Sequence, residues 1–373
     1  MDFIKTLPHL VLGNDVLPFI LSFCTALIIA HVSIPTIVHI ARAKNLFDEP
    51  NARASHQVRT PTFGGTAIFS GLIISAMIFM DLSRPETSYI QYVIAGSLII
   101  FLIGLKDDIL SISPLKKLIG QFIAAGILID LGNIRFTNLH GFCGIYEINY
   151  FVSAILSLFV IIVIINSFNL IDGVDGLASG IGMVCTLTFG VWFFLIGHTQ
   201  LAILALALTG GLLGFFWFNV FSKDNKIFMG DTGSLLLGYF ISVLVIKFNE
   251  LNIGLSHELA TNAAPAVSIG ILIVPLFDTI RVFMIRILRG RSPFSPDKNH
   301  VHHRLLKLFN SHKKTSATII GINLCFVALC YFLRSWDIIS LLLLLLVLAA
   351  GFSYYPVIRI QQRQKKVITK TER

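Results

Sequence analysis

The sequence NSFNLIDGVDGLASG, residues 166–180, joins two long apolar runs, Phe151–Ile165 before it and a second run that begins at Leu177. Two amides, two carboxylates and two glycines occur within eleven residues of it: Asn166, Asn169, Asp172, Gly173, Asp175 and Gly176. Carboxylates and amides at the end of an apolar helix are costly to desolvate, so they predict a bound cation or dense hydrogen bonding. The same residue types are typical of an ordinary turn between two helices, and both interpretations stay open on this stretch alone.

The composition predicts a polytopic membrane protein. Of the 373 residues, 55% are hydrophobic and 13% are charged, whereas soluble domains carry about 25% charged residues. A membrane helix needs roughly 20 apolar residues, or fewer when flanking side chains can reach the interface. Eleven runs meet this rule: Val16–Ile40, Thr62–Met80, Tyr89–Leu105, Leu115–Leu131, Phe151–Ile165, Leu177–Gly197, Leu201–Phe221, Ser234–Phe248, Ala264–Ile285, Ser316–Leu333 and Ile338–Tyr355. We therefore expect an all-α protein with about eleven transmembrane helices in a single integral-membrane domain, residues 1–373.

The charge distribution predicts the orientation. Eleven spans place the termini on opposite faces, and 23 of the 29 Lys and Arg residues fall on the face of the C-terminus. Because Lys and Arg accumulate on the cytoplasmic side, we expect the N-terminus outside and the C-terminus in the cytoplasm, with residues 357–373 forming a basic cytoplasmic tail. Membrane lipid and an anionic substrate account for the net charge of +9, so we expect no nucleic acid as a partner.

All the dense polar motifs fall on this predicted cytoplasmic face. They lie in the segments Arg53–Gly65, Gly104–Lys117, Asn166–Gly180, Phe228–Ser234 and Pro293–Arg304. Five motifs that are far apart in the sequence therefore meet at one surface of the membrane, which favours a common site.

Three carboxylates are candidates for the chemistry. Asp107 and Asp108 are adjacent at a helix end, where one pKa should rise unless a cation is bound; alternatively they cap a helix or lie in solvent. Asp231 lies between glycines just before a predicted helix, where it could bind Mg²⁺ or act as an N-cap.

The last polar segment combines histidines with cations: His300, His302, His303 and Arg304. This spacing is not that of a usual zinc site and no cysteine is near, so an anion-binding surface is the better hypothesis. A basic loop on anionic lipid is the alternative. Asp278 and Arg281 are three residues apart in the ninth predicted span, which allows them to pair within one helix.

Carboxylates for a divalent cation and basic groups for phosphates, at one membrane face, indicate phosphoryl transfer involving a lipid. A cation-coupled transporter is the main alternative and would use Asp107, Asp108, Asp231 and Asp278. It should place acids near mid-membrane, however, and only Asp278 lies there. A non-catalytic lipid-binding subunit is the third class, and it would not need paired carboxylates beside amides.

Four motifs in this order carry a specific resemblance: Lys106-Asp107-Asp108, NxxNxxDGxDGL from Asn166, MGDTGSLxLG from Met229, and SPFSPDxxHxHH from Ser292. With them the chain resembles the polyprenyl-phosphate N-acetylhexosamine-1-phosphate transferases over nearly its whole length. It is more distantly similar to the peptidoglycan translocase that transfers phospho-MurNAc-pentapeptide. The HVHH segment favours the GlcNAc branch.

The resemblance implies an integral protein of the bacterial inner membrane with a cytoplasmic active site, Mg²⁺ or Mn²⁺ as cofactor, a UDP-amino sugar as donor and undecaprenyl phosphate as acceptor. The implied reaction transfers GlcNAc-1-phosphate to the lipid and releases UMP, as the first membrane step of a surface glycan such as O-antigen lipopolysaccharide or teichoic acid. Which amino sugar, which glycan and whether the protein forms a homodimer do not follow from the sequence.

The resemblance also implies roles for individual residues. Asp107, Asp108 and Asp231 match catalytic positions, and one of the first two is expected to act on the lipid phosphate. Asn169 and Asp231 match metal ligands. Lys117 is expected to bind the diphosphate, although Lys116 beside it could be the matching lysine instead. Asp175 is expected to face the uracil, and His302, His303 and Arg304 the sugar phosphate. Asn166, Asp172 and His300 are also expected to bind substrate.

Overall fold

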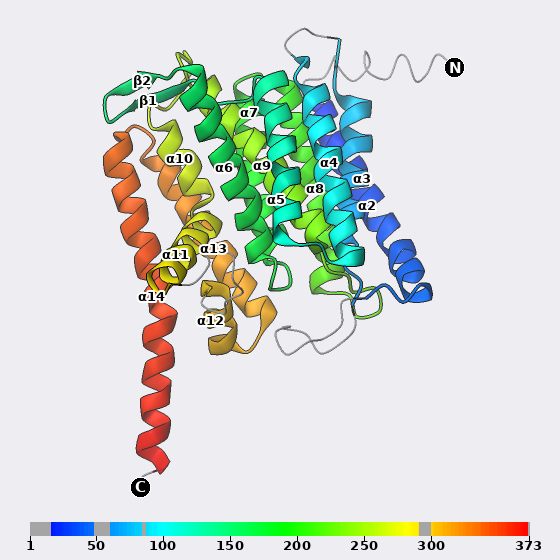
Figure 1. Ribbon diagram of the computed structural model, residues 1–373, viewed down its shortest axis with the longest axis vertical. Coiled ribbons are helices and arrows are strands. Elements are labelled where there is room, and N and C mark those ends of the chain that lie inside the picture. Colours follow the sequence, from blue (N-terminus) through cyan, green and yellow to red (C-terminus); the bar gives the residue numbers. More distant parts are fainter. Residues whose placement is uncertain (1–15, 48–59, 84–86, 291–299, 372–373) are drawn as a thin grey trace.

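The computed structural model describes residues 16–47, 60–83, 87–290 and 300–371, with side chains up to residue 362. The predicted motif residues 53–56 and 292–299 lie outside these ranges. The described chain is almost entirely helical, and most of its long helices run side by side in one bundle (Figure 1).

Within the described residues, seven helices are long and apolar enough to cross a membrane. They are α2 (Leu17–Ala43), α6 (Tyr150–Ile171), α7 (Leu177–Leu195), α8 (Thr199–Val220), α9 (Gly230–Leu251), α13 (His312–Phe332) and α14 (Ile338–Thr371). The prediction of a helical polytopic membrane protein is therefore confirmed. The count of eleven spans and the orientation of the termini stay predictions.

The other four predicted spans are the uninterrupted helix α4 and three shorter or interrupted segments. They correspond to α3 (Gly64–Phe79), α4 (Ile90–Leu110), α5 (Pro114–Gly126) followed by the π-helical turn η2 (Ile127–Leu131), and the pair α10 (Ala264–Ile271) and α11 (Ile273–Leu288).

The ninth predicted span is broken at Leu272, and α11 leaves at an angle to α10 (Figure 1). Pro275 explains the break because it has no backbone N–H to donate to the carbonyl of Ile271. That carbonyl instead accepts a hydrogen bond from Asn323 Nδ2 at 3.1 Å. The break directs α11 across the bundle towards the polar motifs.

A short β-hairpin departs from the all-α prediction. Strands β1 (Asn138–Phe142) and β2 (Ile145–Glu147) pair antiparallel at the end of the molecule opposite the short helix α12 (Val301–Phe309) (Figure 1). The carboxylate of Glu250 fixes the hairpin because it accepts hydrogen bonds from the backbone N–H and the hydroxyl of Thr137, both at 2.7 Å.

Helix α9 is the centre of the bundle and contacts α3, α4, α6 and α7. Nearly all its side chains are buried. Because α9 begins at Gly230, its position in the core also fixes the position of Asp231 at the end of the bundle. Helix α14 runs beyond the bundle at the end that holds α12 (Figure 1), and the side chains of the predicted basic tail after residue 362 are outside the description.

Candidate active site

The start of α9 is held by the segment 61–65. Three backbone hydrogen bonds of 2.8 to 2.9 Å join this segment to residues 228–229. Gly230 follows with φ +70°, and a Cβ there would lie 2.0 Å from the carbonyl oxygen of Thr62 and 2.7 Å from Asp108 Oδ1. Only glycine fits this position, and its conformation turns the chain so that α9 begins beside α4.

Asp108 caps α9. Its Oδ1 accepts the backbone N–H of Asp231 at 2.7 Å, and its Oδ2 accepts the backbone N–H and the hydroxyl of Thr232 at 3.0 and 2.6 Å. Burial raises the pKa of Asp108 to about 7, although the three donated hydrogen bonds favour the ionised form. Helix capping, one of the two open interpretations of the acidic pair, therefore applies to Asp108, and the capped helix is α9 instead of α4.

Asp107 points to a different neighbour. Its carboxylate and that of Asp231 both contact the ammonium group of Lys117, while Ile112 donates its backbone N–H to Asp107 at 2.6 Å. Burial, together with a hydrogen bond between Asp107 and Asp231, raises the pKa of Asp107 to about 6. Two carboxylates therefore share one ammonium group.

Asn169 completes this group of side chains from the end of α6. Its Nδ2 donates to Asp231 Oδ1 at 2.5 Å and to the hydroxyl of Ser234 at 2.9 Å. Rotation of the amide would present its oxygen to the same point. Carboxylate and amide oxygens are the ligands that Mg²⁺ prefers, and two nearby carboxylates favour a bound cation, so these residues fit a Mg²⁺ site.

A cavity of about 540 Å³ opens beside this group. Helix α5, the end of α6, helix α11 and the start of α12 line it. Six of the predicted site residues are among its walls: Lys117, Asn166, Asn169, Asp172, His300 and His303. The cavity thus brings together residues from three of the polar motifs. Asp107 and Asp231 adjoin this cavity through their contacts with Lys117 and Asn169.

Two of these residues have their environment fixed by neighbours. Asn166 donates from Nδ2 to Gln121 Oε1 and to the carbonyl of Ile162, both at 2.8 Å. Burial, reinforced by the negative charges of Asp231 and of other nearby carboxylates, raises the pKa of Asp172 well above its ordinary value. The cavity is therefore lined by an ordered amide and by a carboxyl group that would gain from a cation.

Asp175 lies outside this lining. Its Oδ2 pairs with Lys226 Nζ at 2.6 Å, its carbonyl accepts the Ser316 hydroxyl at 2.5 Å, and its N–H donates to His312 Nδ1 at 3.2 Å. Lys226 Nζ is also 5.6 Å from the centre of the Phe228 ring. Asp175 therefore belongs to a separate group of side chains beside the cavity.

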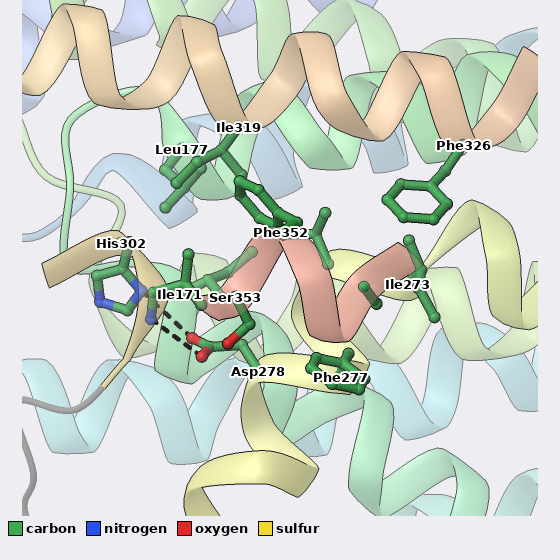
Figure 2. Close-up of a pocket in the computed structure, with 13 residues that line it drawn as sticks. Ile171, Leu177, Ile273, Phe277, Asp278, His302, Ile319, Phe326, Phe352 and Ser353 are labelled. Carbon is green, nitrogen blue, oxygen red and sulfur yellow. Dashed lines mark hydrogen bonds and ion pairs between the residues drawn. The ribbon is translucent and has the colours of Figure 1, made fainter. Parts of the chain in front are cut away.

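His302 also lies outside the lining. It is 2% exposed and borders a small, mainly apolar cavity, where it faces Asp278 (Figure 2). Burial, followed by the influence of His303, lowers the pKa of His302 well below its ordinary value, so its imidazole is neutral. Arg304 is half-buried on α12.

Arg286 was missed by the sequence reasoning, which counted it only among the cytoplasmic cations. It lines the cavity, is 4% exposed, and has its guanidinium 5.7 Å from the centre of the Phe283 ring. It follows Asp278 by eight residues, so the two lie on the same face of α11. This helical spacing was the feature of the sequence from which Arg286 could have been identified.

Comparisons with known proteins show the family of the chain. Residues 90–249 match the Glycosyl transferase family 4. The chain is 32% identical over 312 residues to the probable undecaprenyl-phosphate N-acetylglucosaminyl 1-phosphate transferase of Bacillus subtilis, covering 83% of this chain and 82% of that one. It is 30% identical over 275 residues to the undecaprenyl-phosphate alpha-N-acetylglucosaminyl 1-phosphate transferase of Escherichia coli K12, with 72% and 71% covered. With the decaprenyl-phosphate N-acetylglucosaminephosphotransferase of Mycobacterium tuberculosis H37Rv, identity is 28% over 360 residues, covering 90% and 88%.

Proposed function

Because this chain belongs to the polyprenyl-phosphate N-acetylglucosamine-1-phosphate transferases, we propose that it transfers GlcNAc-1-phosphate from UDP-GlcNAc to undecaprenyl phosphate and releases UMP. The reaction would take place at the cytoplasmic face of the bacterial inner membrane and begin a surface glycan. Membership of a transferase family removes the ground for the transporter and scaffold alternatives.

The proposal rests on one observation: residues of three motifs line a single cavity together with two basic side chains. Lys117 and Arg286 provide positive charge along its wall, and His300 and His303 lie at its edge on the α12 side. Both substrates are anions, so they approach each other only if positive charge offsets their repulsion. A lysine and a buried arginine in one cavity supply that charge for phosphate groups.

The proposed step is attack by an oxygen of the lipid phosphate on the sugar-bearing phosphorus of UDP-GlcNAc. One phosphoanhydride bond forms, between the lipid phosphate and the sugar phosphate, and the phosphoanhydride bond of the donor breaks, so that the uridine-bearing phosphate leaves as UMP. Lys117 and Arg286 hold the phosphates, while Asp107, which contacts Lys117 at the edge of the cavity, orients the lipid phosphate.

We assign a Mg²⁺ site to Asp231, Asn169 and Asp107. Asn169 is hydrogen-bonded to Asp231, and both carboxylates contact the ammonium group of Lys117. When bound, the ion would neutralise charge on the diphosphate.

A second cavity supports a polyprenyl acceptor. It has a volume of about 480 Å³ and almost entirely apolar walls, which include Phe159, Val163, Leu276, Ile280, Met284 and Leu346. Helix α11 borders both cavities: Ile280 and Met284 line the apolar one, whereas Phe283 and Arg286 line the polar one. A lipid could therefore place its phosphate beside Arg286 and its hydrocarbon chain along the other side of α11.

The test is to incubate the purified protein with Mg²⁺, undecaprenyl phosphate and a panel of UDP-sugars, and then to identify the nucleotide and the lipid product by mass. We expect UMP and a lipid diphosphate that carries GlcNAc. Release of UDP would show transfer of the sugar alone, and release of inorganic phosphate would show a phosphatase; either result would reject the proposed reaction.

A further inference from the structure

Asp278 is a buried carboxylate outside the sequence motifs of the site. Three donors reach it: the Arg281 guanidinium at 2.8 Å and the backbone N–H of Val301 at 3.0 Å, both to Oδ1, and His300 Nδ1 at 3.0 Å to Oδ2. His302 Nδ1 is 3.7 Å from Oδ2. Figure 2 shows the carboxylate directed towards the start of α12 and His302.

This arrangement determines which nitrogen of His300 carries a proton. An ionised carboxylate only accepts hydrogen bonds, so His300 Nδ1 must be the donor. In the neutral ring Nε2 is then the free nitrogen. His300 lines the active-site cavity and Asp278 does not, so Nε2 is the polar atom that His300 can offer to a substrate.

The same carboxylate fixes the helix that carries His303. Val301 is the first residue of α12, and no side chain within that helix start caps it. The negative charge of Asp278 at this N-terminus is favourable, and its bond to the Val301 N–H satisfies one of the free donors. One carboxylate therefore holds both cavity histidines, His300 directly and His303 through α12.

We propose that Asp278 is a positioning residue for the transfer reaction, which holds His300 with its proton on Nδ1 and Nε2 available to a phosphate oxygen of the donor. When Nε2 takes up a proton, the imidazolium stays paired with Asp278 and donates to that phosphate oxygen. The inference rests on the proposed function, since it needs a phosphorylated substrate in the cavity.

A metal ion is the rival explanation of this cluster. Ligand atoms of Asp278, His300 and His302 lie within 4.8 Å of one another, which a zinc ion could use. Arg281 already neutralises the carboxylate, however, and the Val301 N–H occupies the same oxygen. A divalent ion would add charge beside a guanidinium, so the hydrogen-bonded pair is the better explanation.

Replacement of Asp278 by asparagine gives a selective test. The amide oxygen must remain at the Oδ1 position, because Arg281 and the Val301 N–H both donate there. The amide NH₂ then faces His300 Nδ1, which can only accept. The Asp278→Asn variant should therefore move the His300 proton to Nε2 and exclude the imidazolium, while the shape of the site is kept.

The tautomer is read directly from two-dimensional ¹H–¹⁵N spectra of the full chain labelled with ¹⁵N-histidine, with His300 assigned from a His300→Gln variant. We expect a protonated Nδ1 in the wild type and a protonated Nε2 in Asp278→Asn. The same ring state in both proteins, or a protonated Nε2 in the wild type, would overturn the inference. So would one equivalent of zinc per chain in the purified protein, measured by elemental analysis.

Kinetics give the second readout. We expect Asp278→Asn to lower kcat/KM for UDP-GlcNAc about 100-fold, the order expected when a charge-assisted hydrogen bond is lost. The double variant with His300→Gln should be no slower than His300→Gln alone; additive losses would mean that Asp278 acts on stability and not through His300. Asp130→Asn, at an acid bonded to Tyr150 at 2.8 Å, is the matched control. A wild type that releases no UMP would reject the proposed function, and the tautomer spectra would still decide the pairing of Asp278 with His300.

Discussion

Two groups of carboxylates in this protein have opposite surroundings. At the start of α9, Asp107 and Asp231 share the single ammonium group of Lys117, and burial raises the pKa of Asp107 to about 6. On α11, Asp278 alone receives a guanidinium, a backbone N–H and an imidazole. The first group has one cation for two carboxylates, although Ile112 and Asn169 also donate to it, whereas the single carboxylate of the second has a cation and two further donors of its own.

The difference separates a reactive group from a supporting one. Carboxylates with few hydrogen-bond donors are stabilised when they bind a cation. This stabilisation favours binding of a substrate–metal complex. A fully satisfied carboxylate gains nothing from a ligand and instead keeps its neighbours in place. The number of donors around each acid, which the sequence does not contain, therefore indicates its role.

The largest effect is expected at Asp231. Asp231→Asn should lower transfer more than about 1,000-fold, because it removes one charge from a site whose Mg²⁺ needs carboxylate ligands. The thermal midpoint should change little, since Lys117 still pairs with Asp107. Transfer rates at saturating Mg²⁺ and melting curves measure both, with the exposed Asp224→Asn as control. Activity within tenfold of wild type would remove Asp231 from the metal site.

Asp108 lies next to the reactive carboxylates but has the hydrogen bonds of a supporting one, so its substitution tests the distinction. It caps α9 with three accepted hydrogen bonds, so Asp108→Asn should cost about 1–2 kcal/mol of stability, the usual range for a lost cap. Transfer should fall about 100-fold, because the start of α9 carries Asp231. Asp107→Asn, which contacts Lys117, should lower transfer without this loss of stability.

Melting temperatures and transfer rates of the two variants are to be compared side by side. If Asp108→Asn melts like the wild type and is inactive, Asp108 belongs to the reactive group and is not mainly a cap.

The sequence predicts much of this site because the motifs are local. The amides and acids of residues 166–172 lie on consecutive turns at the end of one apolar run, so their common position at a helix end follows from the pattern. The pairing of Asp278 with Arg281 was also predictable from their spacing, and the structure confirms it at 2.8 Å.

The remaining features depend on contacts between distant segments. Asp108 caps a helix whose donor Asp231 lies 123 residues later, and His300 meets Asp278 only because α11 turns away from α10 at Leu272. The β-hairpin was missed because its strands are short and Gly141 and Gly144, both at positive φ, hide the alternation of apolar and polar residues.

His302 and His303 are adjacent in the sequence but have different surroundings. His303 lines the active-site cavity, whereas His302 is buried against Asp278. His303→Ala should raise the KM for UDP-GlcNAc about tenfold, the effect of losing a hydrogen bond to a phosphate, with the melting temperature unchanged. His302→Ala should lower the melting temperature, because it leaves a space inside the protein.

Steady-state kinetics and melting curves of the two single variants measure this division, and in His303→Ala UMP binding should be less affected than KM. If instead His302→Ala raises KM without loss of stability, His302 contacts the substrate and belongs with the reactive group.

The smallest effect is expected at Asp175, which the family resemblance places opposite the uracil and the structure pairs with Lys226 beside the Phe228 ring. A carboxylate next to an aromatic face can accept a hydrogen bond from a base that stacks on the ring, but it must first give up Lys226. That competition reduces the binding free energy that the hydrogen bond to the base contributes. Asp175→Asn should therefore weaken UMP binding only about fivefold, which is less than the loss expected for a hydrogen bond to a charged group without a competitor. Lys226→Met removes the competitor and should not weaken UMP binding. Calorimetric titration of UMP into both variants and the wild type decides the point: equal affinity for wild type and Asp175→Asn would leave Asp175 with a purely structural role between α6 and α13.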